Sequence, residues 1–132
     1  LSGASLVGRS VLVEGTGMAV DAQGIGHGGL ELDTATDRTS VEVLNSAGLV
    51  IDTIDLGALG AGRHSFDWTP AAGLDPAQAS RFRIKASVGA KEITATPLQR
   101  DTVEAVSSGS EGLVLELAGA GPVAYDKVKV FD

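Results

Sequence analysis

Short apolar runs in which every second residue is polar recur along the whole chain, and this spacing predicts β-strands. The clearest run covers residues 81–88, where Phe82, Ile84, Ala86 and Val88 alternate with basic or small residues. Similar short runs occupy residues 9–14, 18–21, 30–33, 91–96, 102–106, 113–117 and 125–131. No segment has the 3.6-residue period of a helix, apart from a turn expected near residues 75–80. The pattern therefore predicts an all-β protein.

Residues 39–68 hold the densest part of this pattern. Three apolar runs are separated by the turn-forming segments 45–48 and 57–62, which predicts a β-meander of consecutive antiparallel strands. In the last run His64, Phe66 and Trp68 alternate with polar residues, so one bulky face is expected to point inward. Trp68 is the single tryptophan of the chain, and we interpret it as the anchor of a core.

Breaks in the pattern predict where the strands end. Residues 34–38 are polar, the glycine cluster at residues 24–29 indicates a loop or a change of direction, and Pro97 is expected to close the strand before it because it cannot donate to a ladder. Residues 107–112 and 118–122 contain glycine and predict hairpin connections. Residues 1–8 are expected to be the end of a helix or a linker.

Composition and charge narrow the class of protein. The chain has 132 residues, which is enough for one domain of ordinary size or two small ones. Hydrophobic residues make up 43% of it but aromatic residues only 4%, so its core must be mainly aliphatic. Eighteen glycines without a fixed period indicate many turns. The net charge of −7 argues against a nucleic-acid partner. Without cysteine, the chain can form neither a disulfide nor a thiolate zinc site.

The ends of the chain and its apolar runs bear on localisation. No apolar run approaches the roughly 20 residues that span a bilayer, so membrane insertion is not expected. The chain starts at Leu1 without an initiator methionine and shows no signal peptide. We therefore expect a fragment whose natural N-terminal part is missing.

Two motifs suggest chemistry, but each has a simpler explanation. Gly24, Gly26 and Gly29 have the spacing of a dinucleotide-binding loop, yet the residues that follow predict a strand and not the helix whose N-terminus would hold a pyrophosphate. His27 and His64 have no metal-ligand spacing. A partly buried, hydrogen-bonded side chain is the ordinary interpretation of His64. We predict neither catalytic nor cofactor-binding nor metal-binding residues.

The charged residues are expected on solvent-exposed surfaces, and their pattern does not indicate an active site. Four acidic residues that occur in close pairs (Asp33, Asp37, Asp52 and Asp55) lack the pattern of a calcium loop and are expected on solvated loops or strand faces. The basic stripe Arg81, Arg83 and Lys85 is the single concentrated positive feature. It either steers an acidic protein partner or pairs with carboxylates on a neighbouring strand. These three are the candidate partner-contact residues.

The order of several motifs resembles the C-terminal core of the flagellar hook-capping protein family, FlgD. The matching segments are LVGRSV at residues 6–11, VEVLNSAGLVIDT at 41–53, LG at 56–57, Gly62, FDW at 66–68 and VAYDKVKV at 123–130. In one departure, Trp68 is followed by Thr69 and Pro70, whereas the family commonly has aspartate and glycine there.

The resemblance implies a specific architecture. A small tudor-like barrel would form from both chain ends, residues 1–26 and 98–132, with an immunoglobulin or fibronectin III-like sandwich, residues 27–97, inserted between them. Residues 9–14 should then pair with strands after Pro97 and not with residues 39–68. Trp68 would anchor only the sandwich, and a second core would contain Val11, Val13, Leu113, Leu115, Leu117, Val128 and Val130.

The resemblance also implies a function. The chain would belong to a non-enzymatic scaffold, without cofactors, that is exported to the distal end of the growing flagellar hook and promotes assembly of hook subunits. Its partners would be hook protein subunits and, in the full-length protein, other cap subunits. The alternative is a carbohydrate-binding or adhesion sandwich, which normally needs exposed aromatic rings. A hydrolase would need a histidine within hydrogen-bond reach of a serine and a carboxylate.

Overall fold

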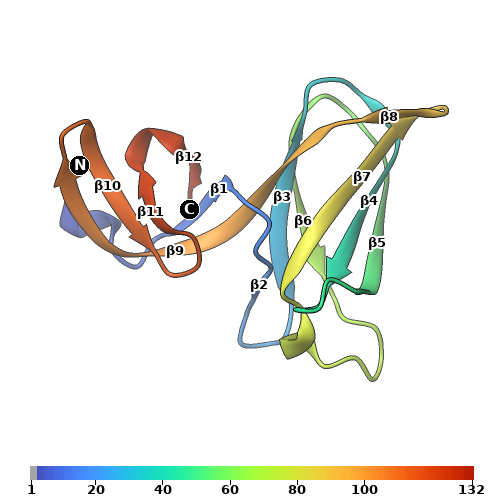
Figure 1. Ribbon diagram of the computed structural model, residues 1–132, viewed down its shortest axis with the longest axis horizontal. Coiled ribbons are helices and arrows are strands. Elements are labelled where there is room, and N and C mark those ends of the chain that lie inside the picture. The colour runs from blue at the N-terminus through green and yellow to red at the C-terminus, as the bar shows by residue number, and fades with distance from the viewer. Residues whose placement is uncertain (1–2) are drawn as a thin grey trace.

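The chain folds into a small barrel and a two-sheet sandwich that share one long strand (Figure 1). The computed structural model describes residues 3–132, so Leu1 and Ser2, part of the expected N-terminal linker, lie outside the described residues. The elements are η1 (Gly3–Leu6), β1 (Ser10–Glu14), β2 (Ala19–Val20), β3 (Gly26–Leu32), β4 (Thr36–Leu44), β5 (Val50–Leu59), β6 (Gly62–Trp68), η2 (Pro76–Gln78), β7 (Arg81–Val88), β8 (Lys91–Ile93), β9 (Ala95–Gly109), β10 (Gly112–Leu117), β11 (Gly121–Ala124), η3 (Tyr125–Lys127) and β12 (Val128–Phe131). This confirms an all-β fold, with the expected turn near residues 75–80 present as η2.

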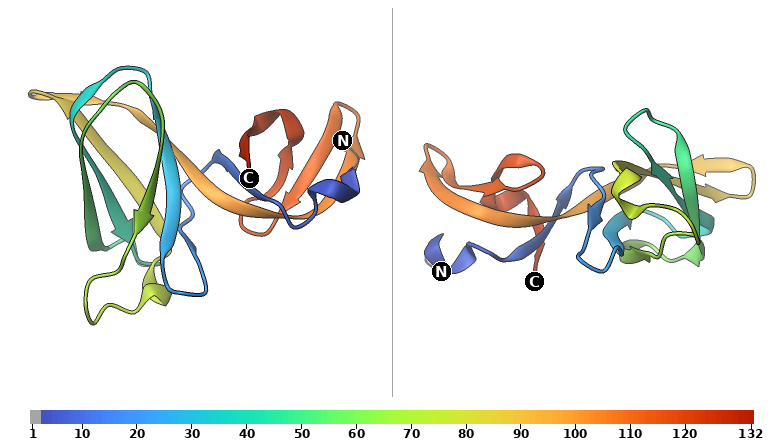
Figure 2. Two further views of the ribbon diagram at one scale, coloured as in Figure 1. Left: turned by 180° about the vertical axis from the view of Figure 1, so that it is seen from behind. Right: turned by 90° about the horizontal axis from the view of Figure 1, so that it is seen from below.

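Strand β9 connects the two units. Its first residues pair with β3 in the sandwich, its middle pairs with β1, and its last part pairs with β10 in the barrel. The barrel sheet has the order β11-β10-β9-β1-β12, and the sandwich places β2, β3 and β6 opposite the four-stranded sheet β5-β4-β7-β8. Figure 2 shows β9 running without interruption from one unit into the other. A single continuous strand, β9, therefore belongs to the sheets of both units.

The pairing of β1 confirms the expected return of the chain to the barrel. β1 pairs with β9 from Ser10 opposite Thr102 to Glu14 opposite Leu98, and on its other side with β12. Within the part of the chain that the structure describes, it has no ladder with the strands of residues 39–68. The exact division of the chain at residues 26/27 and 97/98 stays a prediction.

The predicted meander of residues 39–68 is wrong in its third strand. β4 and β5 pair as expected, but β6 pairs with β3 in the opposite sheet. The reason is burial, because a single sheet leaves one face uncovered, whereas a crossing between β5 and β6 places Phe66 across from Phe82, with ring centroids 5.1 Å apart. Trp68 is 1% exposed and is buried in the sandwich, as expected of an anchor.

The glycine cluster is partly a turn and partly a strand. Gly24, with a φ of 80°, lies in the turn between β2 and β3, where a change of direction was expected, but residues 26–29 lie in β3 and correct the prediction of a loop there. Gly26 and Gly28 lie in β3 directly opposite Trp68 and Phe66. A Cβ at Gly26 would lie 2.9 Å from Trp68 Cε3, and one at Gly28 would lie 2.6 Å from Phe66 Cζ. The glycines are therefore needed because the two large rings occupy the space of their missing side chains.

Two further predicted breaks are also inside strands. The polar segment 34–38 overlaps β4, where Thr36 and Thr39 are buried and their hydroxyls lie 2.6 Å apart, so each satisfies the other. Pro97 does not close a strand but lies inside β9. Its carbonyl accepts from the N–H of Gly15 at 3.1 Å, so its ring nitrogen faces the same side, just beyond the end of β1. The missing donor therefore costs no ladder hydrogen bond.

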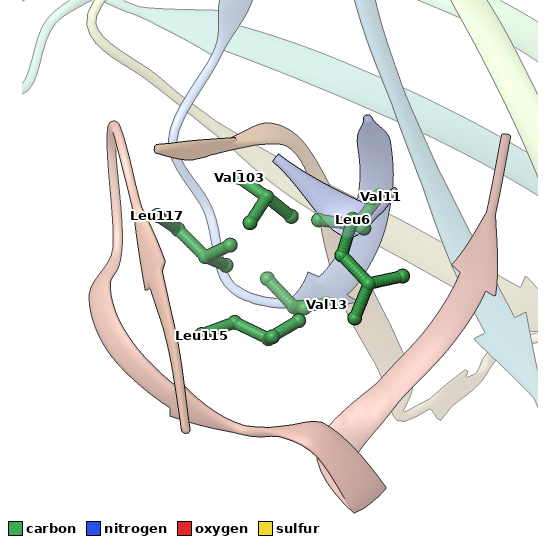
Figure 3. Packing of buried hydrophobic residues seen from close by; sticks show 6 residues of the cluster. All are labelled: Leu6, Val11, Val13, Val103, Leu115 and Leu117. Atoms are coloured by element: carbon green, nitrogen blue, oxygen red, sulfur yellow. The ribbon is translucent and has the colours of Figure 1, made fainter. Parts of the chain in front are cut away.

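The barrel has the second core that was expected (Figure 3). Its buried members are Leu6, Val11, Val13, Val103, Leu115 and Leu117, with Val128 packed against them. Leu113 and Val130 are not part of this cluster, contrary to the prediction.

The short helix η3 and a register shift between β1 and β12 explain the wrong prediction for Val130. The expected strand over residues 125–131 begins with η3, and only Val128–Phe131 is extended. The register with β1 shifts between Leu12 and Val13, so Val13 opposes Val128 but Val11 opposes Phe131. Phe131 therefore packs against the core in place of Val130.

Candidate protein-interaction site

The three predicted contact residues lie together on the outer face of the four-stranded sheet. Phe82 and Ala86 of β7 are buried in the sandwich core, so Arg81, Arg83 and Lys85 point to the opposite, solvent-facing side and are exposed. This arrangement follows from the strand alternation seen in the sequence. Whether these residues contact a partner stays a prediction.

One of the three is held by a neighbouring carboxylate. Arg83 Nε lies 2.7 Å from Glu42 Oε1, directly across the β4–β7 ladder, which is the cross-strand pairing considered as the alternative. Arg81 and Lys85 form no ion pair among residues 3–132. Two of the three cations therefore remain available to a partner.

A fourth cation, Arg38, belongs to the same face and was missed from the sequence. It lies in β4 opposite Ser87 of β7 and lines, with Arg83 and Lys85, an open hollow of about 500 Å³ beside β7 and β8. Its segment was predicted to be a break, so its outward position could not be assigned. We call Arg38, Arg81, Arg83 and Lys85 the basic face.

His27 is clamped between two carboxylates. Its Nε2 lies 2.7 Å from Asp21 Oδ2, and its Nδ1 lies 2.7 Å from Asp67 Oδ1. The hydrogen bond with Asp21 is the main reason why the pKa of His27 is raised above 6.5, with burial opposing and Asp67 adding to the shift. The same hydrogen bond lowers the pKa of Asp21. In its protonated form His27 donates from both ring nitrogens and ties β3 to β6 and to the turn after β2.

The clamp has a defined dependence on pH. Because the pKa of His27 is raised in the folded state, the contribution of His27 to folding stability is complete below pH 6.5. It is lost as the pH rises through the raised pKa. Because the pKa of Asp21 is lowered, the contribution of Asp21 to folding stability is complete above pH 3.8 and is lost as the pH falls through the lowered pKa. Between pH 3.8 and pH 6.5 both residues stabilise the fold in full.

Neither histidine has the surroundings of a hydrolase site. Both ring nitrogens of His27 are hydrogen-bonded to carboxylates, so neither nitrogen is free to accept a proton from a serine. His64 Nε2 donates to the carbonyl oxygen of Gly60 at 2.7 Å, which agrees with the structural interpretation of this residue. The geometry thus assigns both histidines to holding strands and loops in place.

The acidic residues singled out in the sequence organise turns and the core. Asp37 accepts from the N–H of Gly89, and Asp55 accepts from the N–H of Gly57. Asp52 accepts from Trp68 Nε1 at 2.8 Å and from the N–H of Ala71. Burial raises the pKa of Asp52, but these hydrogen bonds outweigh burial and the pKa is lowered. Among the described residues, no group of three or more His, Cys, Asp or Glu could hold a metal ion.

A buried polar network fixes the junction between the barrel and the sandwich. Gln99 and Asp101 are neighbours on the inner side of β9, at 9% and 7% exposure, and Gln99 Nε2 donates to Asp101 Oδ2 at 2.9 Å. Gln99 Oε1 accepts from the N–H of Gly17 in the link between β1 and β2, and Asp101 accepts from Gly119 and Ala120 in the β10–β11 turn. Sequence reasoning missed both residues, because pairing of buried polar groups from distant segments leaves no local signal.

Ion pairs add a second link across the junction. Glu31 in β3 lies 3.0 Å from Arg63 of β6 and 3.4 Å from Lys129 of β12, so it joins both sandwich strands to the barrel. Together with β9, these contacts hold the two units in a fixed relation.

Three of the five aromatic residues are buried, and the other two are half-buried and in contact with each other. Phe66, Trp68 and Phe82 are at most 4% exposed, and Tyr125 stacks against Phe131 with the ring centroids 5.4 Å apart. These five are all the phenylalanine, tryptophan and tyrosine residues of the chain. The carbohydrate-binding alternative therefore lacks the exposed rings on which it depends. No helix in the described part of the chain is both long and apolar enough for a transmembrane span.

Comparison with known proteins identifies similar chains. The family model of the FlgD tudor-like domain matches residues 1–129. The basal-body rod modification protein FlgD of Escherichia coli K12 is 31% identical over 140 residues, which cover 98% of this chain and 60% of that protein. The chain thus spans about three fifths of the length of this curated relative.

Solved structures give the same result. A crystal structure of FlgD from P. aeruginosa superposes with a TM-score of 0.76 at 29% identity and covers 96% of this chain and 98% of its own. FlgD from Xanthomonas campestris, whose structure is described as giving insights into the hook capping essential for flagellar assembly, has a TM-score of 0.73 at 29% identity, with 98% and 96% coverage. The similarity extends over both the barrel and the sandwich.

Proposed function

Because the chain belongs to the FlgD family, we propose that it is the folded core of a scaffold at the tip of the growing bacterial flagellar hook, where it promotes assembly of hook subunits. The observation that carries this proposal is the match of the family model to residues 1–129, together with the similarity of the whole fold to a FlgD described in terms of hook capping. The location is the extracellular distal end of the hook.

The architecture suits such a role. A scaffold that templates subunit addition must present its surfaces in a fixed geometry, and here one 15-residue strand, a buried polar network and the Glu31 ion pairs link the two units. The role requires neither catalysis nor a cofactor. Hook subunits and other cap subunits are the proposed partners, and the basic face is the candidate contact surface, because it offers cations without partners on an otherwise acidic chain.

Complementation tests the proposal. The full-length parent protein should restore hooks, seen by electron microscopy of isolated basal bodies, to bacterial cells that lack their own hook cap. A matched parent with Leu115→Asp, which places a charge in the barrel core, should fail although it is expressed. If the unaltered parent is expressed and exported in the cells and hooks are still absent, the proposed function is wrong.

A further inference from the structure

Strand β6 has one edge without a partner strand. Its other edge pairs with β3 over all seven residues, from Gly62 opposite Leu32 to Trp68 opposite Gly26, without a register shift. In the described part of the chain, no strand other than β3 pairs with β6. Every second backbone N–H and C=O of β6 therefore lacks a ladder partner. We call this side of β6 the free edge.

The hydrogen bonds of the β2–β3 hairpin show which groups of β6 face the free edge. The N–H of Asp21 donates to the carbonyl oxygen of Ile25, which therefore faces β2. Because the direction of the backbone groups alternates along a strand, those of the even-numbered β3 residues point to β6. In the β3–β6 ladder even-numbered residues oppose even-numbered residues. The backbone N–H and C=O groups of Arg63, Ser65 and Asp67 consequently face the free edge.

The other long edge strand of the sandwich, β5, is protected against pairing, whereas β6 is not. The β4–β5 ladder contains register shifts, and the carboxylates of Asp52 and Asp55 accept from the N–H groups of Thr53 and Gly57. Bulges and charged side chains at an edge are common devices that prevent the addition of a foreign strand. The free edge of β6 has neither a proline nor a register shift. It is therefore open to strand addition.

The surface beside the free edge is acidic. An open hollow of about 410 Å³ is lined by Asp52 and Asp55 of β5, by Asp67 of β6 and otherwise by uncharged residues. Each carboxylate already accepts a hydrogen bond from the chain, but a carboxylate offers about four acceptor positions, so all three can still bind a cation. A segment that docks on the free edge therefore meets negative charge, which favours lysine and arginine.

We propose that the free edge of β6 binds an extended segment of another protein, which adds to the sheet as a further strand and carries lysine or arginine at alternate positions. Side chains of an added strand alternate between the two faces of the sheet. Those on the inner face would point across the sandwich to Asp52 and Asp55, and those on the outer face would lie beside Asp67. Backbone hydrogen bonds supply the affinity, and the charges select the sequence.

The choice of partner follows from charge. A second copy of this chain is a less suitable occupant, because each copy has a net charge of −7 and the two would repel each other. The free edge is also separate from the basic face, which lies on the other sheet of the sandwich. The inference does not rest on the proposed cap role, since it uses only the edge of β6 and the charges beside it.

A peptide titration tests the proposal on the 132-residue chain. The probe is an eight-residue peptide of alternating lysine and threonine, blocked at both ends. At a free peptide concentration of about nine times its Kd, hydrogen exchange at the amides of Arg63, Ser65 and Asp67 should slow about tenfold, as measured by NMR. The amides of Thr53 and Gly57 on β5 should keep their rates. If about 1 mM peptide at low salt protects none of the three β6 amides, the proposal is wrong.

Two control peptides separate strand addition from charge attraction. The first has every backbone nitrogen methylated, so it keeps the charges but cannot donate to the free edge, and it should give no protection. The second has glutamate in place of lysine and should not bind, because like charges meet. Equal protection by the methylated peptide would refute strand addition, and equal binding of the glutamate peptide would refute the charge argument. Protection that grows with protein concentration in the absence of peptide would assign the free edge to a second copy and overturn the choice of partner.

Variants of the chain locate the site. Ser65→Pro removes the central N–H of the free edge but no hydrogen bond to β3, and should weaken peptide binding about twofold to tenfold. Asp55→Asn keeps an acceptor for the N–H of Gly57, removes one negative charge and should weaken binding about twofold to fivefold. Asp126→Asn, which removes the same charge from the barrel, should leave the Kd unchanged.

The amide spectrum outside β6 shows whether each variant is folded. If folded Ser65→Pro binds as tightly as the unaltered chain, strand addition at this edge is wrong. If Asp126→Asn weakens binding as much as Asp55→Asn, the attraction is not specific to the hollow and the proposal is also wrong. Asp55→Asn leaves the backbone of β6 intact, so this comparison decides even where Ser65→Pro does not fold. None of these outcomes depends on whether the parent protein restores hooks.

Discussion

Replacing Gly28 by alanine tests the reason for the glycine cluster in β3. The new Cβ would lie 2.6 Å from Phe66 Cζ, closer than real Cβ contacts, so the ring must move away from its edge-on contact with Phe82. Overpacking of this kind costs about 1–3 kcal/mol. The alanine also restricts the unfolded chain, which stabilises the folded state by about 0.4–1 kcal/mol. We therefore expect a net destabilisation of about 1–2 kcal/mol.

Urea unfolding, followed by the fluorescence of Trp68, measures this change. With a slope of about 1–3 kcal/mol per molar urea, the midpoint of Gly28→Ala should fall by about 0.3–2 M. Gly60→Ala is the matched control, because a Cβ at this position would have no heavy atom within 4 Å beyond its chain neighbours, and the φ of Gly60 is not positive. That variant should unfold at the same or a slightly higher urea concentration.

A double-mutant cycle identifies the clash. Phe66→Leu alone should destabilise, but in the Gly28→Ala background it should cost less by about 1 kcal/mol, because the shorter side chain leaves room for the methyl group. If Gly28→Ala behaves like Gly60→Ala, or if the two changes at Gly28 and Phe66 are additive, the steric explanation of the cluster is refuted.

Three other predictions follow from the contacts described above. His27→Gln should lower the urea midpoint below pH 6.5, and the difference from the unaltered chain should shrink as the pH rises through the raised pKa of His27. Leu115→Ala should cost about 2–5 kcal/mol in urea unfolding, because Leu115 is fully buried in the barrel core. Asp52→Ala should cost about 1–3 kcal/mol, because it leaves the indole N–H of Trp68 without its acceptor, and should shift the emission of Trp68.

Each of these has a control. If His27→Gln destabilises the chain equally below and above the pKa of His27, the role of the protonated ring between Asp21 and Asp67 is contradicted. Leu49→Ala, at a side chain that is 64% exposed, should change stability by less than about 0.5 kcal/mol, and an equally small loss at Leu115 would contradict its core position. Asp52→Asn keeps an acceptor oxygen for Trp68 and should recover most of the stability lost in Asp52→Ala.

Local alternation was enough to predict most strands and the inward residues of the longest ones. The period of two in residues 81–88 placed Phe82 and Ala86 in the core and Arg83 and Lys85 outside, because strand geometry fixes alternate faces whatever the partner strand is. The pairing of β1 with the last third of the chain could not be read from local pattern. It came from the resemblance to a family, since sequence spacing does not encode which strands meet.

The errors share one cause, which is that tertiary neighbours decided the local structure. Gly28 looks like a loop residue until Phe66 is placed opposite it, and Pro97 looks like a strand end until the end of β1 is placed beside it. Alternation predicts that Val130 points inward like Val128, but the register between β1 and β12 shifts by one residue, so Phe131 packs against the core instead. Each of these depends on a segment more than 30 residues away.

The candidate site was predictable only in part. The stripe on β7 was found because three cations at alternate positions are visible in one strand. Arg38 joins it from β4, and the Gln99–Asp101 network draws on turns far along the chain, so neither leaves a local pattern.

The place where the chain leaves and re-enters the barrel has a consequence for how the family can vary. Glu14 and Leu98 are ladder partners, and Gly15 N lies 3.1 Å from Pro97 O. In the topology of the barrel, the sandwich therefore occupies the position of the loop that connects two paired strands. Closing a loop costs only about 0.6 kcal/mol more for each doubling of its length. Insertions and deletions in the sandwich turns away from β3 and β9 should therefore leave Glu14 and Leu98 paired, and the barrel can stay constant while those turns change in length.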